Sequence, residues 1–384
     1  MRGFSDEQTP LFFTFRLEDR IRPDHPLRDI KKRVDRILDT MNADFAEAYS
    51  KMGRPSVPPE RLLKALLLMA LYSVRSERQL CEQIDVNLLF RWFLDMQPDE
   101  DAFDATTFSK NRKRVDEHEL TAKFFDAVVA EAIAKNLCSE HFSVDGTLIE
   151  SYASAKSFQP KSADDKSQDD DANDGNGFKP RNVDVDFHGD KRSNETHAST
   201  TDPEAKLFRK GMGKEAILAL MGHTVAENRN GMILNIQVTE ANGTAERDAA
   251  LAMLDELKET HECQPKTLGA DKGFDSGEFL IDLKERKITA HIPVKGEPAD
   301  PEKVSKARRP GVKARRTMQN RMKTKAYKLS QKCRKKIEEG FGWLKTIAGL
   351  GRSRVVGLWK LQQLMQIGAA AYNLIRMRKL APVT

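Results

Sequence analysis

The first third of the chain places its apolar residues with the spacing of several short helices. A helix is predicted over 26–50, and a strongly apolar one over 60–74 follows Pro58 and Pro59, residues that suit a helix start. Shorter helices are expected over 77–84 and 88–94. A basic helix capped by Thr106 or Thr107 comes next, and then a helix over about 118–136. This pattern predicts an all-α N-terminal domain over 1–137.

From residue 141 the pattern changes to short apolar strands alternating with helices. Strands are predicted over 141–150, 215–226, 232–239, 266–270 and 288–294, and helices over 245–260, 276–286, 327–344 and 358–379. The segment Asn228–Gly231 predicts a hairpin turn between the second and third strands. Three strands and then alternating helices and strands form the element order of an α/β ribonuclease H-like core, a mixed sheet flanked by helices. We expect this domain over 138–380.

Two polar stretches interrupt the second domain. Residues 155–200 are rich in Asp, Ser, Asn, Lys and Gly and have almost no apolar side chains, so we expect a disordered or loosely held insertion. Residues 301–326 form a basic stretch, and within it 303–325 are expected to have little regular structure.

Composition and charge narrow the class of protein. The longest apolar run, 62–71, is shorter than a membrane span, and the N-terminus lacks an apolar signal core, so a cytoplasmic protein without a membrane partner is expected. The four cysteines are scattered, which disfavours a zinc or disulfide framework. Residues 301–384 carry 22 Lys and Arg against 3 Asp and Glu. Such a block indicates a polyanion partner, and nucleoid association follows from it.

The basic helix of the N-terminal domain is a candidate DNA contact. It carries Arg112, Lys113 and Arg114 after several short helices with tight turns, an arrangement typical of helix-turn-helix proteins. Many small helical bundles share this pattern. A purely structural or dimerising role for the region therefore stays open.

Three carboxylates stand on the elements expected to build a catalytic centre. Asp145 lies inside the first apolar strand, where a charge is costly without a partner or a metal ion. Asp271 closes the fourth strand between Gly269 and Gly273, and Glu338 lies on the basic helix after the last strand. Converging carboxylates suit two Mg²⁺ ions in phosphodiester chemistry, and Mn²⁺ can substitute. We therefore expect Asp145, Asp271 and Glu338 as catalytic residues and metal ligands.

The spacing around Glu338 supports this choice. Arg334 and Lys345 stand four residues before and seven residues after it, so all three side chains share one face of the helix, whereas Glu339 points about 100° away. An acid flanked by two bases suits a metal held beside phosphate. The alternative is an exposed helix face with ordinary salt bridges.

These residues resemble the bacterial insertion-sequence DDE transposases of the IS-four/IS-five superfamily, whose C-terminal signature is Tyr-(2)-Arg-(3)-Glu-(6)-Lys. Arg334, Glu338 and Lys345 fit that spacing, but Gln331 occupies the tyrosine position, which leaves the activity of this copy open. The stretches 142–147 and 269–275 resemble the family's two Asp motifs. Residues 352–358 and 371–376 resemble its C-terminal helix region, and 53–115 its N-terminal domain.

The resemblance implies a ribonuclease H-like core, two Mg²⁺ or Mn²⁺ ions, double-stranded DNA with terminal inverted repeats as substrate, and a homodimer in the synaptic complex. It implies cleavage at the repeats and joining of the 3′-hydroxyl ends to target DNA. Basic side chains near the C-terminus are expected to hold the DNA: Arg334, Lys335, Lys345, Arg352 and Arg354. Two alternatives stay open, a catalytically silent or domesticated DNA-binding regulator and a ribonuclease H-like nuclease that cuts without joining.

Overall fold

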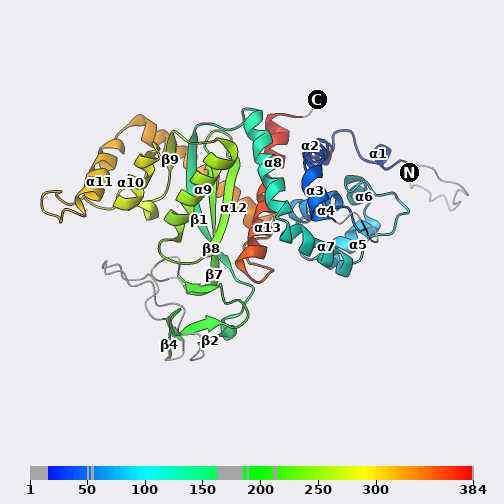
Figure 1. The fold of residues 1–384 in the computed structure, drawn as a ribbon, viewed down its shortest axis with the longest axis horizontal. Helices are drawn as coiled ribbons and strands as arrows, with labels where there is room; N and C mark the ends of the chain where they lie inside the picture. Colours follow the sequence, from blue (N-terminus) through cyan, green and yellow to red (C-terminus); the bar gives the residue numbers. More distant parts are fainter. Residues whose placement is uncertain are drawn as a thin grey trace, which may run out of the picture.

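The computed structural model describes residues 16–49, 52, 56–161, 185–187, 190–209, 211, 213 and 215–382. The molecule is elongated, with a helical part at the N-terminal side and a sheet-containing part beyond it (Figure 1). None of the helices in the described part of the chain is long and apolar enough to cross a membrane.

The helical part contains eight helices among the described residues. The helix predicted over 26–50 is divided at Met41, where the chain leaves the helical conformation between α2 and α3. Ser76 and Asn87 cap the helices that follow them, each by accepting hydrogen bonds from backbone N–H groups of the first turn. The helices are α1 (Leu17–Arg20), α2 (Pro26–Thr40), α3 (Asn42–Ala48), α4 (Pro59–Leu71), α5 (Glu77–Val86), α6 (Leu88–Phe93), α7 (Ala105–Glu117) and α8 (Leu120–Ala134).

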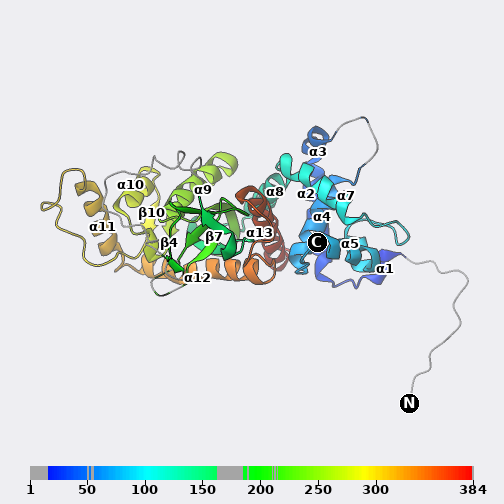
Figure 2. The same cartoon turned by 90° about the horizontal axis from the view of Figure 1, so that it is seen from below.

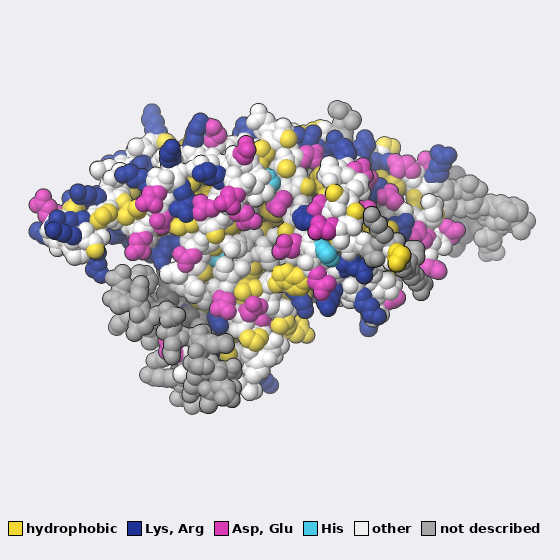
Figure 3. Space-filling view, viewed as in Figure 1, with side chains coloured by type: hydrophobic (Ala, Val, Ile, Leu, Met, Phe, Trp, Pro, Cys, Tyr) yellow, Lys and Arg dark blue, Asp and Glu magenta, His cyan; other side chains and the backbone are white. Residues whose placement is uncertain are grey.

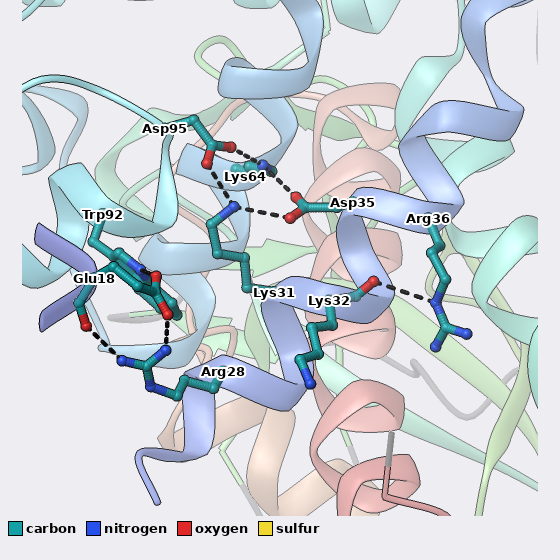
Figure 4. Close-up of polar contacts among 9 residues, drawn as sticks. All are labelled: Glu18, Arg28, Lys31, Lys32, Asp35, Arg36, Lys64, Trp92 and Asp95. Carbon is teal, nitrogen blue, oxygen red and sulfur yellow. Dashed lines mark hydrogen bonds and ion pairs between the residues drawn. The ribbon is translucent and has the colours of Figure 1, made fainter. Parts of the chain in front are cut away.

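Two lysines and two aspartates connect three segments of the helical part (Figure 4). The side chain of Lys64, on α4, is only 5% exposed, and its ammonium lies between the carboxylates of Asp35 and Asp95. Lys31, on α2, pairs with the same two carboxylates at 2.8 and 2.6 Å. A buried ammonium needs such partners, because desolvation of an unpaired charge costs several kcal/mol.

The second part is built on one mixed six-stranded sheet. Its central strand β1 (His141–Glu150) pairs antiparallel with β7 (Ile217–Glu227) and parallel with β9 (Thr267–Gly269). β10 (Thr289–His291) continues the parallel side, while β8 (Ile233–Glu240) and β6 (Lys206–Phe208) follow one another along the outer edge of β7. The predicted hairpin is confirmed, because β7 turns into β8 through Gly231 at φ +70°.

Helices cover both faces of this sheet (Figure 2). α9 (Ala245–His261) and α10 (Gly277–Glu285) lie on one face, α12 (Lys325–Thr346) lies on the other, and α13 (Leu358–Leu380) runs along the edge of the sheet at β8. The class predicted from the sequence, a mixed sheet flanked by helices, is confirmed. The last helix also reaches beyond the sheet, because α13 packs on α8, α4 and α2, and one hydrophobic core runs through both parts.

Amide side chains of α13 complete the hydrogen bonding of β8. The buried Asn373 accepts from the backbone N–H of Ile233 at 2.9 Å and donates to its carbonyl at 2.7 Å. Gln362 accepts from Val238 N–H and donates to the Ile236 carbonyl. These contacts satisfy backbone groups of a strand edge that would otherwise be buried without partners.

Two expectations about polar stretches need correction. The basic stretch is not of low order: 309–321 form α11 (Arg309–Arg321), because Pro310 opens the helix and Met318 packs into the core at 1% exposure. The insertion is partly ordered, since β2 (Phe158–Pro160) pairs with β5 (His197–Ser199) and β3 (Val185–Phe187) with β4 (Asp190–Arg192). Residues 162–184 of the insertion lie outside the described residues.

The lysine and aspartate cluster gives a stability prediction. The double variant Asp35→Asn/Asp95→Asn leaves two ammonium groups without carboxylates, so its free energy of unfolding should fall by about 3 kcal/mol. Lys64→Met keeps the volume and removes the buried charge, and should cost about 1 kcal/mol. Urea denaturation followed by circular dichroism measures both. A larger loss for Lys64→Met than for the double variant would contradict this account of the cluster.

Candidate active site

Asp145 lies near the middle of β1, opposite Thr224 on β7, and its side chain points toward α12. The side chain is 19% exposed, and one carboxylate oxygen accepts a hydrogen bond from Arg334 Nη1 at 3.2 Å. Burial, and after it the charge of Asp271, raise the pKa of Asp145 to about 6, while Arg334 and the Gly146 N–H act in the opposite direction. Asp145 is therefore a buried acid held close to other charges.

Asp271 stands two residues after the end of β9, the strand that pairs directly with β1. Its carboxylate caps the short 3₁₀ helix η3 (Lys272–Phe274) by accepting the N–H of Gly273 at 2.6 Å. Because β1 and β9 are parallel neighbours, the carboxylates of Asp145 and Asp271 meet at the same region of the sheet. The two carboxylates are close enough for the charge of Asp271 to raise the pKa of Asp145.

Glu338 reaches the same region from α12. Its side chain is 59% exposed and pairs with Arg334 at 3.4 Å, so the guanidinium lies between Glu338 and Asp145. Lys345 donates a hydrogen bond to the Leu148 carbonyl of β1 at 3.0 Å. The predicted face of Arg334, Glu338 and Lys345 thus lies against β1.

Gln331, at the position where the family signature has tyrosine, holds α12 on the sheet. Its side-chain amide donates to the carbonyls of Ala270 and His291, at 3.3 and 2.5 Å. These carbonyls lie at the ends of β9 and β10, next to Asp271. One residue before it, Ser330 fits against Gly269, where a Cβ atom would stand 3.1 Å from the Ser330 hydroxyl.

Glu246 is a carboxylate of this region that the sequence did not single out. It belongs to the first turn of α9, and its carboxylate lies against Gly146 and Gly273: a Cβ atom on these glycines would come within 2.8 and 3.4 Å of its oxygens. Asp271 lies against the same Gly273. The sequence offered two signals: an acid in the first turn of the helix that follows the hairpin, and a glycine in each of the two Asp motifs, which leaves space for another side chain.

The predicted DNA-binding residues do not form one cluster. Lys335 is exposed on α12, but Arg352 pairs with Glu150 at 3.6 Å and Arg354 donates to the Val74 carbonyl. On α7, the three side chains predicted to bind DNA have protein partners. Arg112 pairs with Glu77 and Asp116, Lys113 pairs with Glu117, and Arg114 stacks 4.8 Å from the Tyr49 ring.

The oxygen donors of the site suit a hard divalent cation. Asp145, Asp271 and Glu246 offer only carboxylate oxygens, which Mg²⁺ and Mn²⁺ prefer. Among the described residues, however, no three acidic, histidine or cysteine side chains stand close enough together, as placed, to hold one ion. Arg334 supplies the positive charge between Asp145 and Glu338 instead. A shared ion requires Glu338 to turn toward Asp145, and its exposure leaves room for that rotation.

Two family models match the chain. The family described as Transposase domain (DUF772) matches residues 15–114, and the Transposase DDE domain matches residues 177–374, more than half of the chain. Asp271 and Glu338 lie inside the second match, whereas Asp145 lies between the two. No curated protein matches the chain.

Several solved transposase structures are similar to the chain at low identity. A piggyBac transposase synaptic complex with hairpin DNA is 11% identical over 94% of this chain and 83% of the other, with a TM-score of 0.28. A Mos1 transposase paired-end complex with the left transposon end is 10% identical over 82% and 85%, with a TM-score of 0.20. A Mos1 paired-end complex with Mn is 12% identical over 83% and 86%, with a TM-score of 0.20. Likeness at this level carries no argument about the present site.

The raised pKa of Asp145 predicts the direction in which stability depends on pH. The folded chain keeps a proton on Asp145 up to about pH 6, whereas the unfolded chain releases it near 3.8. The folded state therefore loses stability as pH rises from about 4 to about 6. Without metal, Asp145→Asn should raise the free energy of unfolding by about 2 kcal/mol at pH 7.5. The difference should vanish at pH 4. An equal effect at both pH values would rule out this account.

The contacts of Gln331 predict a role in holding α12. Gln331→Leu removes both hydrogen bonds and leaves two strand-end carbonyls without this donor, which should cost about 1 to 2 kcal/mol of stability. Amide hydrogen exchange of α12 should also accelerate. Lys328→Leu, an exposed position on the same helix, is the control and should change neither quantity. Unchanged exchange in the Gln331 variant would show that α12 is held by other contacts.

Proposed function

The chain belongs to the Transposase DDE domain family, and from this premise we propose that Asp145, Asp271 and Glu338 form its DNA-cleaving and DNA-joining centre. As a DDE transposase it is an enzyme. The observation that carries the assignment of residues is their convergence: β1, β9 and α12, far apart in the sequence, bring the three acids and Arg334 to one region.

The strand order supports a ribonuclease H-like core. β8, β7 and β1 form an antiparallel half, and β9 and β10 extend β1 with two parallel strands. The centre then lies on the middle strand and at the end of its parallel neighbour, where α/β folds commonly place their sites. In this proposal Gln331 occupies the position of the signature tyrosine and holds α12 on the sheet, while the three acids keep their role as metal ligands.

The proposed substrate is double-stranded DNA that carries the terminal inverted repeats of an insertion sequence. Bound Mg²⁺ or Mn²⁺ would activate the attacking oxygen and stabilise the leaving oxygen of an in-line displacement. Asp145 and Asp271 would hold the ions, and Glu338 would complete the ligand set after leaving Arg334. Arg334 would then be available to a DNA phosphate. Water attacks in the cleavage step, and the released 3′-hydroxyl attacks target DNA in the joining step.

The dimer is a further part of the same proposal. Joining two ends to one target needs two centres, which a homodimer in a synaptic complex supplies. The alternatives are a nuclease that cuts without joining and a silent DNA-binding regulator. The convergence of all three acids favours a chain that still cleaves DNA.

The triad gives the decisive activity prediction. Asp145→Asn, Asp271→Asn and Glu338→Gln should each lower metal-dependent cleavage of DNA carrying the element's ends by roughly a thousandfold, the loss of several kcal/mol of transition-state stabilisation. DNA binding should persist. Glu339→Gln is the matched control, because Glu339 neighbours Glu338 but pairs with Arg376 on α13.

The outcomes separate the candidate functions. Cleavage followed by joining of 3′ ends supports the transposase. Cleavage without joining in the same assay would support the nuclease, and binding without any cleavage by the unmodified chain would support the regulator. Full activity of the Glu338 variant together with loss in the Glu339 variant would move the third ligand to Glu339.

A further inference from the structure

A groove lined by basic side chains runs between α10, β10 and α11, at the end of the molecule away from the helical part (Figure 1). It encloses a volume of about 660 Å³. Its floor is apolar, formed by side chains such as Leu280, Ile288 and Met318. No Asp or Glu lines it, although the chain as a whole has 58 acidic residues. Lysine and arginine side chains gather around this end of the molecule in Figure 3.

Five exposed cations line the groove, and of these Arg309 donates a hydrogen bond to the Val304 carbonyl at 3.4 Å. None of them forms an ion pair with a carboxylate in the described part of the chain, although most cations of the helical part do. They come from α10, from the turn before β10, from the turn before α11 and from the first part of α11: Lys284, Lys287, Lys306, Arg309 and Lys313. Like charges brought together without counter-ions repel, so such a cluster is best explained by an anionic partner.

Other cations of the same stretch bind groups of the protein itself. Arg315 donates to both carboxylate oxygens of Asp275, whose side chain is 1% exposed, and to the Lys295 carbonyl. Arg321, at the edge of the groove, donates to the Ala290 carbonyl at 3.0 Å. The structure thus divides the basic stretch into side chains that fix α11 and side chains that face solvent.

The groove is rigidly built. α10 and α11 cross at Gly277 and Gly311, where a Cβ atom on Gly277 would come within 2.6 Å of the Gly311 backbone. With Arg315 pairing to Asp275, this close crossing fixes the spacing of the two helices. Arg309 and Lys313 follow one another by one turn on α11, and the positive end of the α11 dipole adds to their field. A preformed cationic surface binds an anion without first ordering its own backbone.

We propose that this groove binds the phosphate backbone of a DNA duplex without regard to base sequence. Lysine ammonium groups on flexible stems suit phosphate oxygens, and contacts of this kind position DNA without reading its bases. The proposal rests on the proposed function, because that function makes DNA the polyanion this chain meets. It adds a DNA-binding surface separate from the carboxylate centre and from the basic helix α7.

The test uses the full chain and a fluorescein-labelled duplex of about 30 base pairs of arbitrary sequence. Lys284→Gln/Lys306→Gln/Lys313→Gln should reduce the slope of log affinity against log salt concentration by about 2 to 3, since each lost phosphate contact removes about 0.9. Affinity at about 0.1 M salt should fall roughly tenfold to a hundredfold. A duplex carrying the element's ends should lose the same factor.

The matched control removes three exposed lysines from α2, α9 and α13: Lys32→Gln/Lys258→Gln/Lys379→Gln. It has the same net charge as the groove variant, and its slope should change by less than about 1. Equal slopes for the two triple variants would overturn the proposal that the groove binds DNA. A loss confined to the element's ends also overturns it, because the contact would then depend on sequence.

The same samples separate this proposal from the proposed function. The groove variant, at low salt and saturating protein, should still cleave DNA with metal. If the unmodified chain cleaves DNA and the slopes are equal, the function stands and the groove fails. If the unmodified chain never cleaves but the slopes differ as expected, the groove stands and the catalytic proposal fails.

Discussion

The fixed position of α12 on the sheet is the constraint on which the rest of the site depends. Side chains along the helix donate to backbone carbonyls of several separate segments. Gln331 binds the ends of β9 and β10, Lys336 binds the turn between β7 and β8, and Lys345 binds β1. Each contact alone contributes modestly, about 1 kcal/mol. Together they define both the register and the rotation of the helix, and so place Arg334 and Glu338 beside β1.

Opposing electrostatic effects act on the carboxylate of Asp145. Burial and Asp271 raise the pKa of Asp145 to about 6, so the fold bears a cost for ionising it. Arg334 reduces that cost by lying between Asp145 and Glu338. Divalent cations at the same place would supply more positive charge and release the guanidinium toward DNA. The structure therefore connects the stability of the metal-free chain with the chemistry proposed for it.

The remaining elements support this centre in different ways. α13 completes the edge of β8 through Asn373 and Gln362 and extends into the helical part, so sheet and helices share one core. Glycine at 146 and 273 leaves space for Glu246 next to Asp271, which adds a further carboxylate to that end of the sheet. α11 lies at the opposite side from the helical part (Figure 1), and two of its exposed cations, Arg309 and Lys313, have no carboxylate partner among the described residues. Cationic surfaces and the acidic centre are thus separated along the molecule.

The sequence by itself determined the order of the longer strands and most helices, the hairpin at Gly231 and the family motifs around Asp271 and Glu338, because periodicity, turn residues and spacing are local properties. It missed the short strand β6. It did not determine that 309–321 are helical, since their few apolar residues give a weak periodic signal and Met318 needs the core to bury it. Nor could it assign Glu246 or the role of Gln331. Those depend on which strand end each side chain meets, and only the packing of α9 and α12 on the sheet decides that.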